Sequence, residues 1–156
     1  MKAKLDEQNV IKASAQFWEQ MLAIALETAP PGMLCLQAGH MFGAVALSGV
    51  WQGRIEVRMA NGLAFEATAA MMMQSLDTVG ELDVLDATKE IANMIAGTIK
   101  SSLPRPCSMT VPESAVERED FCAPAGSEDS LVVGFRHKAG DMLVRIWEQE
   151  YTQDSI

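Results

Sequence analysis

The sequence predicts an α+β fold, in which helices pack on an antiparallel or mixed sheet. Long stretches with apolar residues at helical spacing alternate with short stretches in which apolar and polar residues alternate. The short stretches come in adjacent pairs with turn residues between them, which is typical of hairpins rather than of a doubly wound parallel sheet. With 156 residues, the chain suits one domain, expected over residues 1–156.

The composition favours a folded protein with neither nucleic acid nor membrane as a partner. Hydrophobic residues make up 49% and charged residues 21% of the chain, which is too apolar for a disordered protein. The apolar stretches are interrupted well before the ~18 residues of a membrane span. A formal net charge of −9 repels nucleic-acid phosphates. No apolar run accompanies the first lysines, so no secretory signal is predicted and the cytoplasm is the expected compartment.

The cysteines and histidines do not form a pattern of their own. Cys35, Cys107 and Cys122 are odd in number and widely spaced, so they fit neither a disulfide framework nor a CxxC site, and we expect reduced thiols. His40 and His137 have no Glu or Cys at ligand spacing. No metal site and no cofactor of the protein's own are therefore predicted.

The first half of the chain predicts a helix and a hairpin. Apolar residues recur at helical spacing over about residues 8–27, and the Pro-Pro-Gly run from Pro30 is expected to end this helix. Residues 43–48 and 54–59 predict the two strands of a hairpin, of which the second alternates apolar and charged residues. One face of the hairpin is therefore expected in the core, and the other in solvent or under a polar partner. The apolar face of the first helix is expected to contain Val10, Ile11, Phe17, Trp18, Met21, Leu22 and Ile24.

The second half predicts two helices and a further hairpin. Asn61 is expected to cap a helix that reaches Met73. Thr78 and Glu81 have the capping-box pattern of a longer helix over about residues 79–103, because Pro104 stops it. The remaining segments are predicted as a strand over residues 107–111, a polar loop over residues 112–129, and a final hairpin of residues 131–137 and 142–150.

Two features have two interpretations each. Trp51 stands in the turn of the first hairpin, either as an exposed contact residue or folded back onto its own sheet. Met71-Met-Met73 is either an adaptable binding surface or flexible core filler, and core filler is favoured.

The long helix is expected to have one face for the sheet and one that points outward. Glu90, Asn93 and Gly97 lie about 140–160° from the centre of its apolar stripe, and Asp86 and Lys100 flank them. Glycine inside a helix costs about 1 kcal/mol, and close approach of another surface is one reason to accept that cost. From spacing alone, the simpler interpretation is that the acid and amide are solvated and that Gly97 touches a loop of the protein itself, because E-x-x-N is common by chance. The apolar stripe itself is expected to be Val84, Thr88, Ile91, Ile95, Ile99 and Ser102.

Two motifs together resemble a known family. Residues 88–97, T-K-E-I-A-N-M-I-A-G, resemble the signature helix of the CheC/CheX/FliY phosphatases of bacterial chemotaxis, and are most similar to single-site CheX-like members. Residues 45–58 resemble that family's S-G-x-x-x-G-x-(apolar) hairpin and stand at the expected distance upstream. The resemblance covers nearly the whole chain and weakens after Pro104. The first helix has Trp18-Glu-Gln-Met21 where two-site members carry a second E-x-x-N, so the resemblance implies one site.

The resemblance implies a phosphatase that acts on the aspartyl phosphate of a CheY-type receiver. Glu90 and Asn93 match the family's acid and amide. Asn93 would position a water in line with the phosphorus, and Glu90 would pair with the receiver's lysine. The acyl phosphate is already activated and the receiver holds Mg²⁺, so orienting the water is the main contribution still needed. An amide suits this role because it both donates and accepts hydrogen bonds and does not titrate.

Further contacts follow from the same resemblance. Asp86, Lys89, Gly97 and Lys100 are expected to touch the receiver, and Lys89 stands where many relatives have a small residue, which implies a different receiver preference. A homodimer is also expected, joined through sheet edges that carry few blocking Pro or Lys residues. The alternative from a different class is a non-catalytic module that uses the same helix face to bind a receiver or another partner.

Overall fold

The computed structural model describes residues 5–123 and 130–149. Its helices are α1 (Glu7–Leu22), α2 (Asn61–Met72) and α3 (Glu81–Lys100), with short 3-10 turns η1 (Pro31–Met33) and η2 (Leu76–Thr78). Its strands are β1 (Glu27–Ala29), β2 (Cys35–Leu36), β3 (Met41–Gly49), β4 (Gly53–Met59), β5 (Cys107–Met109), β6 (Glu113–Val116), β7 (Phe121–Cys122), β8 (Ser130–Arg136) and β9 (Met142–Glu148).

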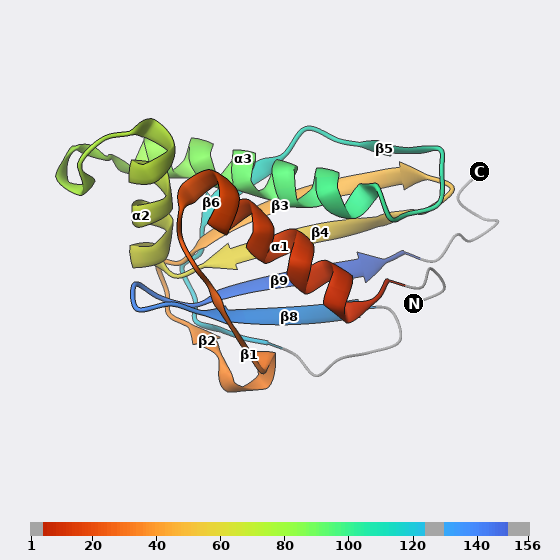
Figure 1. Cartoon of the computed structure of the whole chain (residues 1–156), viewed down its shortest axis with the longest axis horizontal. Helices are drawn as coiled ribbons and strands as arrows, with labels where there is room; N and C mark the ends of the chain where they lie inside the picture. The colour runs from red at the N-terminus through yellow and green to blue at the C-terminus, as the bar shows by residue number, and fades with distance from the viewer. Residues whose placement is uncertain (1–4, 124–129, 150–156) are drawn as a thin grey trace.

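The main sheet has α1 and α3 across one face and α2 at one end (Figure 1). Its strand order is β1-β8-β9-β4-β3-β5, with β6 also paired to β3, and β2 and β7 form a separate two-stranded sheet. All pairings among the described strands are antiparallel. The α+β prediction is therefore confirmed, with a wholly antiparallel sheet in the described part of the chain.

The first hairpin has the predicted two-sided character. In β4, Ile55, Val57 and Met59 are fully buried beneath the helices, while the charged residues between them face the other way. There the guanidinium of Arg58 lies 4.7 Å from the centre of the Phe42 ring. On the polar face of the hairpin, the aliphatic parts of the arginine side chains thus cover the aromatic rings. This packing removes apolar surface from water, and no partner molecule is needed to cover it.

The turn of this hairpin folds back on the sheet. Trp51 is 2% exposed, so the first of its two interpretations, an exposed contact residue, is wrong. Gly53 makes room for it, because a Cβ there would lie 2.2 Å from the Trp51 ring. Gly49 has a φ of +130° and lies against the Pro106 carbonyl, so a side chain is excluded both by conformation and by space. The two glycines of the hairpin motif therefore serve the turn itself.

A third glycine lets α3 lie directly on β3. A Cβ at Gly43 would be 3.0 Å from Thr88 Cγ2 and 3.1 Å from Ala92 Cβ. Small residues on both elements therefore bring the helix close to the sheet and fix its height above the strands.

We expect Gly43→Leu to destabilise the fold. The added side chain has to push α3 away from β3, and overpacking of this kind costs about 1–3 kcal/mol, which corresponds to a loss of several degrees in Tm. Thermal unfolding followed by circular dichroism measures the effect. Gly32→Leu is the matched control, since no described residue comes within 4 Å of a Cβ at Gly32. Equal melting temperatures for the two variants would contradict the close packing.

Several predicted helix ends are wrong. The first helix ends at Leu22, because Ala23 takes a left-handed conformation (φ 55°), and the chain then forms β1 instead of continuing helical to residue 27. Asn61 does not cap α2; its side-chain amide donates to the Gly39 carbonyl at 3.3 Å. The third helix begins at Glu81 and ends at Lys100, inside the predicted limits of residues 79 and 103.

The predicted polar loop over residues 112–129 contains strands β6 and β7, while residues 124–129 lie outside the described residues. Both strands are too short to show a periodic pattern. The final hairpin is confirmed as β8 and β9, with residue 150 outside the described part. Because β9 is interior and β1 pairs with residues 134–136 of β8, this hairpin offers less free edge than the sequence suggested.

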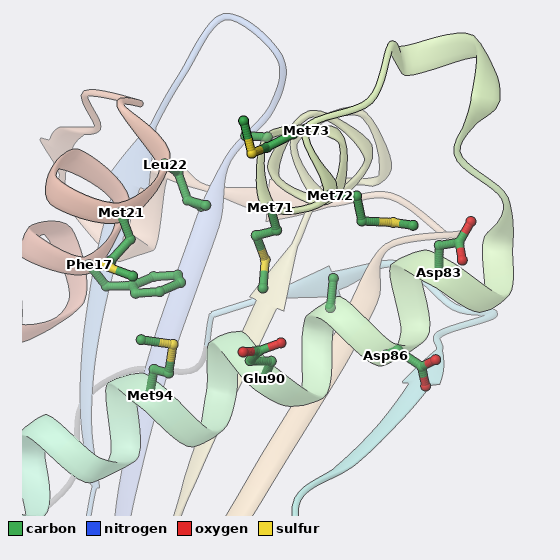
Figure 2. Close-up of a pocket in the computed structure, with 12 residues that line it drawn as sticks. Phe17, Met21, Leu22, Met71, Met72, Met73, Asp83, Asp86, Glu90 and Met94 are labelled. Carbon is green, nitrogen blue, oxygen red and sulfur yellow. The ribbon is translucent and has the colours of Figure 1, made fainter.

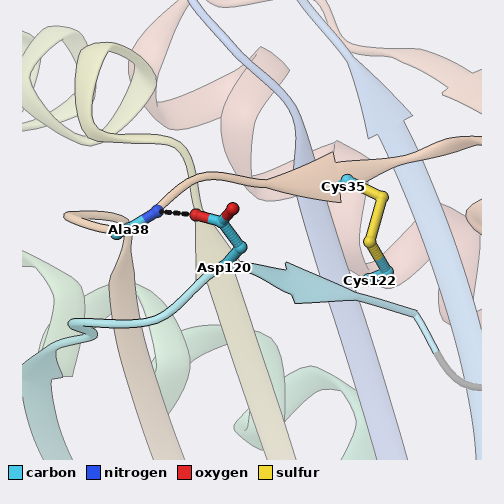
Figure 3. The surroundings of a disulfide bond; sticks show 4 residues. All are labelled: Cys35, Ala38, Asp120 and Cys122. Carbon is cyan, nitrogen blue, oxygen red and sulfur yellow. Dashed lines mark hydrogen bonds between the residues drawn. A yellow bond between two sulfur atoms is a disulfide. The ribbon is translucent and has the colours of Figure 1, made fainter.

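The prediction of three reduced thiols is wrong for two of them. Cys35 and Cys122 are directly opposite in the β2–β7 pair and form a disulfide (Figure 3). The Asp120 carboxylate supports the same connection by accepting a hydrogen bond of 2.7 Å from the Ala38 backbone N–H. Cys107 remains a buried free thiol. The bridged cysteines are 87 residues apart. The strands that carry them have only two residues each, so no sequence pattern indicated that these strands pair.

Candidate functional site

Helix α3 carries all the residues predicted for the site. At its start the Asp83 carboxylate accepts a hydrogen bond of 3.0 Å from Gly80 N–H, and acids in the first turn stabilise the positive end of the helix dipole. Thr78, predicted as the cap, instead lies in η2. The buried stripe contains Val84, Ala87, Thr88, Ile91, Ala92, Ile95, Ala96 and Ile99. Ser102 is exposed beyond the helix end, so its predicted place in the stripe is wrong.

The opposite face of α3 points away from the sheet. Asp86, Lys89, Glu90 and Gly97 are exposed, and Asn93 is half-buried. Among the residues that the structure describes, nothing lies within 4 Å of a Cβ placed on Gly97, so this glycine does not touch a loop in that part of the chain. The internal-contact explanation for Gly97 is therefore wrong, and its backbone is open to another molecule.

The polar groups of this face are not engaged within the protein. In the described ranges, the Asn93 carboxamide makes no hydrogen bond, and the Asp86 and Glu90 carboxylates make no ion pair. Lys100, half-buried in the last turn, is likewise without an acidic partner among those residues. Their hydrogen-bonding capacity is thus available to an incoming partner.

A pocket adjoins the site on the side of α1 and α2 (Figure 2). Glu90 and Asp86 line it together with Asp83, and Asn93 does not. Most of the remaining wall is apolar and comes from three helices. It comprises Phe17, Met21 and Leu22 of α1, Ala70 to Met73 at the end of α2, and Ala87 and Met94 of α3.

Sequence reasoning missed this pocket, although part of its wall gave a signal. Met21 is 64% and Met73 92% exposed, so the expectations that Met21 joins the buried face of α1 and that the methionine run is core filler are wrong for these side chains. Met71 is partly buried against the core. The run of three methionines was the available sign of an adaptable surface.

The buried histidine is part of a polar cluster away from α3. His40 Nδ1 lies 2.9 Å from the Gln37 carbonyl oxygen and Nε2 lies 3.0 Å from an Arg58 nitrogen. Burial lowers the pKa of His40, and the neighbouring Arg58 charge lowers it further. With both ring nitrogens engaged, His40 is a satisfied structural residue. Within residues 5–123 and 130–149, His, Cys, Asp and Glu side chains form no group of three placed to hold a metal.

The face of α3 therefore offers an amide, two carboxylates and an open backbone on a rigid helix. These groups can bind and orient another molecule.

Comparison with known proteins identifies the family of this chain. A family model described as chemotaxis phosphatase CheX matches residues 41–136, more than half of the chain. The chain belongs to the CheX family.

Solved structures agree with this assignment at the level of fold. The chemotaxis protein CheX of Vibrio vulnificus is 18% identical, with a TM-score of 0.73 over 91% of this chain and 95% of that one. A CheC-like superfamily protein from Shewanella sp. PV-4 is 16% identical, with a TM-score of 0.71 over 92% and 96%. A CheX–CheY–BeF₃–Mg²⁺ complex from Borrelia burgdorferi includes a chain that is 18% identical, with a TM-score of 0.69 over 94% and 100%.

No match was found among curated proteins. None of the helices in the described ranges has the length and apolar character needed to cross a membrane. The CheX family model includes β3, β4, α2 and α3, so both motifs on which the family resemblance rested lie inside the matched region.

Proposed function

We propose that this CheX-family protein dephosphorylates a CheY-type receiver, with Asn93 and Glu90 of α3 as its active residues. The observation that carries the proposal is the face described above: an amide and an acid one turn apart, unengaged by the described residues, on a helix whose outward glycine is open. A partner can lie against this face without displacing any described element.

The proposed reaction is the in-line attack of water on the aspartyl phosphate of the receiver. The Asn93 carboxamide orients the water, because it can accept a hydrogen bond from it while donating another to the phosphoryl oxygens. Glu90 pairs with a lysine of the receiver and fixes the register of docking. Mg²⁺ is contributed by the receiver. The structure of a CheX relative in complex with CheY, BeF₃ and Mg²⁺ supports a CheY-type receiver as the partner and the receiver as the source of Mg²⁺.

The neighbouring residues would complete the contact. Lys89 lies about one turn and Asp86 about two turns before Asn93, Gly97 admits the receiver surface closely, and Lys100 lies one turn beyond Gly97. We also propose that residues 1–156 act as one CheX-like domain and that two copies associate through their sheets, where β1 covers only residues 134–136 of β8.

Phosphate release from a charged receiver tests the proposal. CheY-type receivers from the same organism are phosphorylated with acetyl phosphate, separated from the donor and mixed with the protein. We expect release to be faster than for the receiver alone and to rise with the amount of protein. Binding without faster release would instead favour the non-catalytic module.

Glu90→Ala is expected to act mainly on docking. Loss of the carboxylate removes a charge-assisted contact to the receiver's lysine, and exposed or partly exposed pairs of this kind contribute about 1 kcal/mol. KM for the phosphorylated receiver should therefore rise about five- to tenfold, with a smaller change in kcat. Initial rates of phosphate release against receiver concentration measure both quantities. Glu66→Ala, a carboxylate on α2 outside this face, is the control, and an equal rise in KM for both variants would argue against the assigned role.

A further inference from the structure

The pocket beside Glu90 has the size and lining of a binding site. Its volume is about 500 Å³, within the usual range of sites that take a small molecule or a few side chains. Figure 2 shows Met71 reaching from the end of α2 toward the turn of α3 that carries Glu90, with Phe17 and Met21 facing them from α1. Three helices thus meet around an apolar hollow that opens next to the proposed active residues.

Three methionines at the edge of the pocket are exposed to solvent, although their side chains are large and apolar. Met73 is 92%, Met21 64% and Met72 39% exposed. A group of apolar side chains around a hollow is typical of an interaction surface. Methionine suits such a surface because it is flexible and polarisable and can adjust to the shape of what it receives.

The rim of the pocket is acidic and uncompensated. Asp86 and Glu90 have no ion pair among the described residues, and Asp83 is engaged only by the Gly80 N–H. Within the described ranges, no lysine or arginine lines the pocket. A ligand that fills it must therefore bring positive charge beside an apolar group. A second copy of this chain, with a net charge of −9, is a poor match.

We propose that this methionine pocket is a second contact for the receiver, and that it holds an apolar side chain of the receiver flanked by a lysine or arginine. The inference rests on the proposed function, because Glu90 and Asp86 belong both to the pocket and to the face on which the receiver would dock. Because Glu90 lines the pocket, a receiver that meets Glu90 with a basic group lies beside it. The pocket then determines which receivers bind, since only those with an apolar group at that place fill it.

Met21→Lys tests the inference, because it removes an apolar side chain from the exposed rim and adds a positive charge that repels the receiver's basic group, without disturbing the core. Met33→Lys is the matched control: Met33 is 68% exposed, close to the 64% of Met21, but lies in η1 outside the pocket. Affinity is measured by titration with the same organism's CheY-type receiver carrying beryllofluoride and Mg²⁺. We expect Met21→Lys to raise Kd at least about tenfold, Met21→Leu to bind nearly as well as the wild type, and Met33→Lys to bind unchanged.

Phosphate release, measured on the same proteins, distinguishes failure of the pocket inference from failure of the proposed phosphatase function. If the wild type hydrolyses the phospho-receiver but Met21→Lys and Met33→Lys bind it equally, the pocket inference is wrong and the proposed function stands. Met73→Lys, on the α2 side of the pocket, should repeat the loss of affinity, and its failure to do so would also count against the pocket. If the wild type neither binds nor hydrolyses any receiver of the organism, both proposals fail together.

Discussion

Asn93→Ala is expected to lose about 10²-fold or more in phosphate release while the phosphorylated receiver still binds. The substitution removes the group that orients the attacking water, and orientation of a reactant contributes several kcal/mol to a barrier. It leaves Glu90, Gly97 and the pocket in place, so docking persists. The expected signature is a fall in kcat with little change in the affinity for the beryllofluoride-loaded receiver.

Asn93→Gln distinguishes positioning from mere polarity. Glutamine retains the amide but moves it about 1 Å further along, and a displacement of that size in a tight site can cost 10²-fold. We therefore expect Asn93→Gln to be nearly as slow as Asn93→Ala. Because Asn93 is half-buried on the outward face and makes no hydrogen bond among the described residues, neither variant should lower Tm appreciably. Near-normal turnover by Asn93→Gln would show that exact placement of the amide is unimportant.

Gly97→Leu is expected to abolish receiver binding without harming the fold. No other described element comes within 4 Å of a Cβ at this position, so leucine meets no steric obstacle from the described part of the chain. It should even stabilise α3 by several tenths of a kcal/mol through its better helix propensity. Against a docked receiver, however, the same side chain would stand where two surfaces have to meet. Binding assays and thermal unfolding on the same sample separate the two effects.

The outcome that contradicts this assignment is a Gly97→Leu protein that binds the receiver as well as the wild type. A lowered Tm would point instead to an internal role for Gly97. Gly43→Leu gives the reverse pattern for comparison, since Gly43 faces Thr88 and Ala92 in the interior.

Elements with a long local pattern were predictable from the sequence. The alternation in residues 54–59 and the helical spacing in α3 reflect burial of one face, which is a property of each segment by itself. The existence of both hairpins and of α1 and α3, and the buried residues of β4, were predicted correctly for this reason, although the ends of the helices were not. The existence of α2 was also predicted correctly, but its expected cap, Asn61, was wrong. The outward position of Glu90 and Gly97 followed from the same 100° rotation per residue.

Features that depend on distant segments were not predictable. The disulfide between Cys35 and Cys122 needs two strands of two residues each to pair, and neither strand has a pattern. The pocket needs the ends of α1 and α2 to meet α3, so Met21 looked like one more buried residue of an amphipathic helix. The early end of α1 depends on a single residue, Ala23, in a left-handed conformation that alanine rarely adopts.

The candidate site was located mainly by resemblance to a known family, and not by the spacing and chemistry of its residues. An acid and an amide three residues apart are common in helices, and only their register with the Gly49–Gly53 hairpin made the pattern specific. The structure gives those two glycines a role in the turn around Trp51. The hairpin motif therefore indicates the fold, while the proposed chemistry depends on Glu90 and Asn93 of α3.

A time course of phosphate release under single-turnover conditions tests whether the protein hydrolyses the aspartyl phosphate and whether Asn93 orients the attacking water. Phosphorylated receiver is mixed with excess wild-type protein or with excess Asn93→Ala, and free phosphate is followed until the label is exhausted. We expect a wild-type rate that rises with protein concentration and saturates, and an Asn93→Ala rate close to that of the receiver alone. A wild-type rate no faster than that of the receiver alone would exclude the phosphatase activity, and an Asn93→Ala rate equal to the wild-type rate would exclude the role of Asn93.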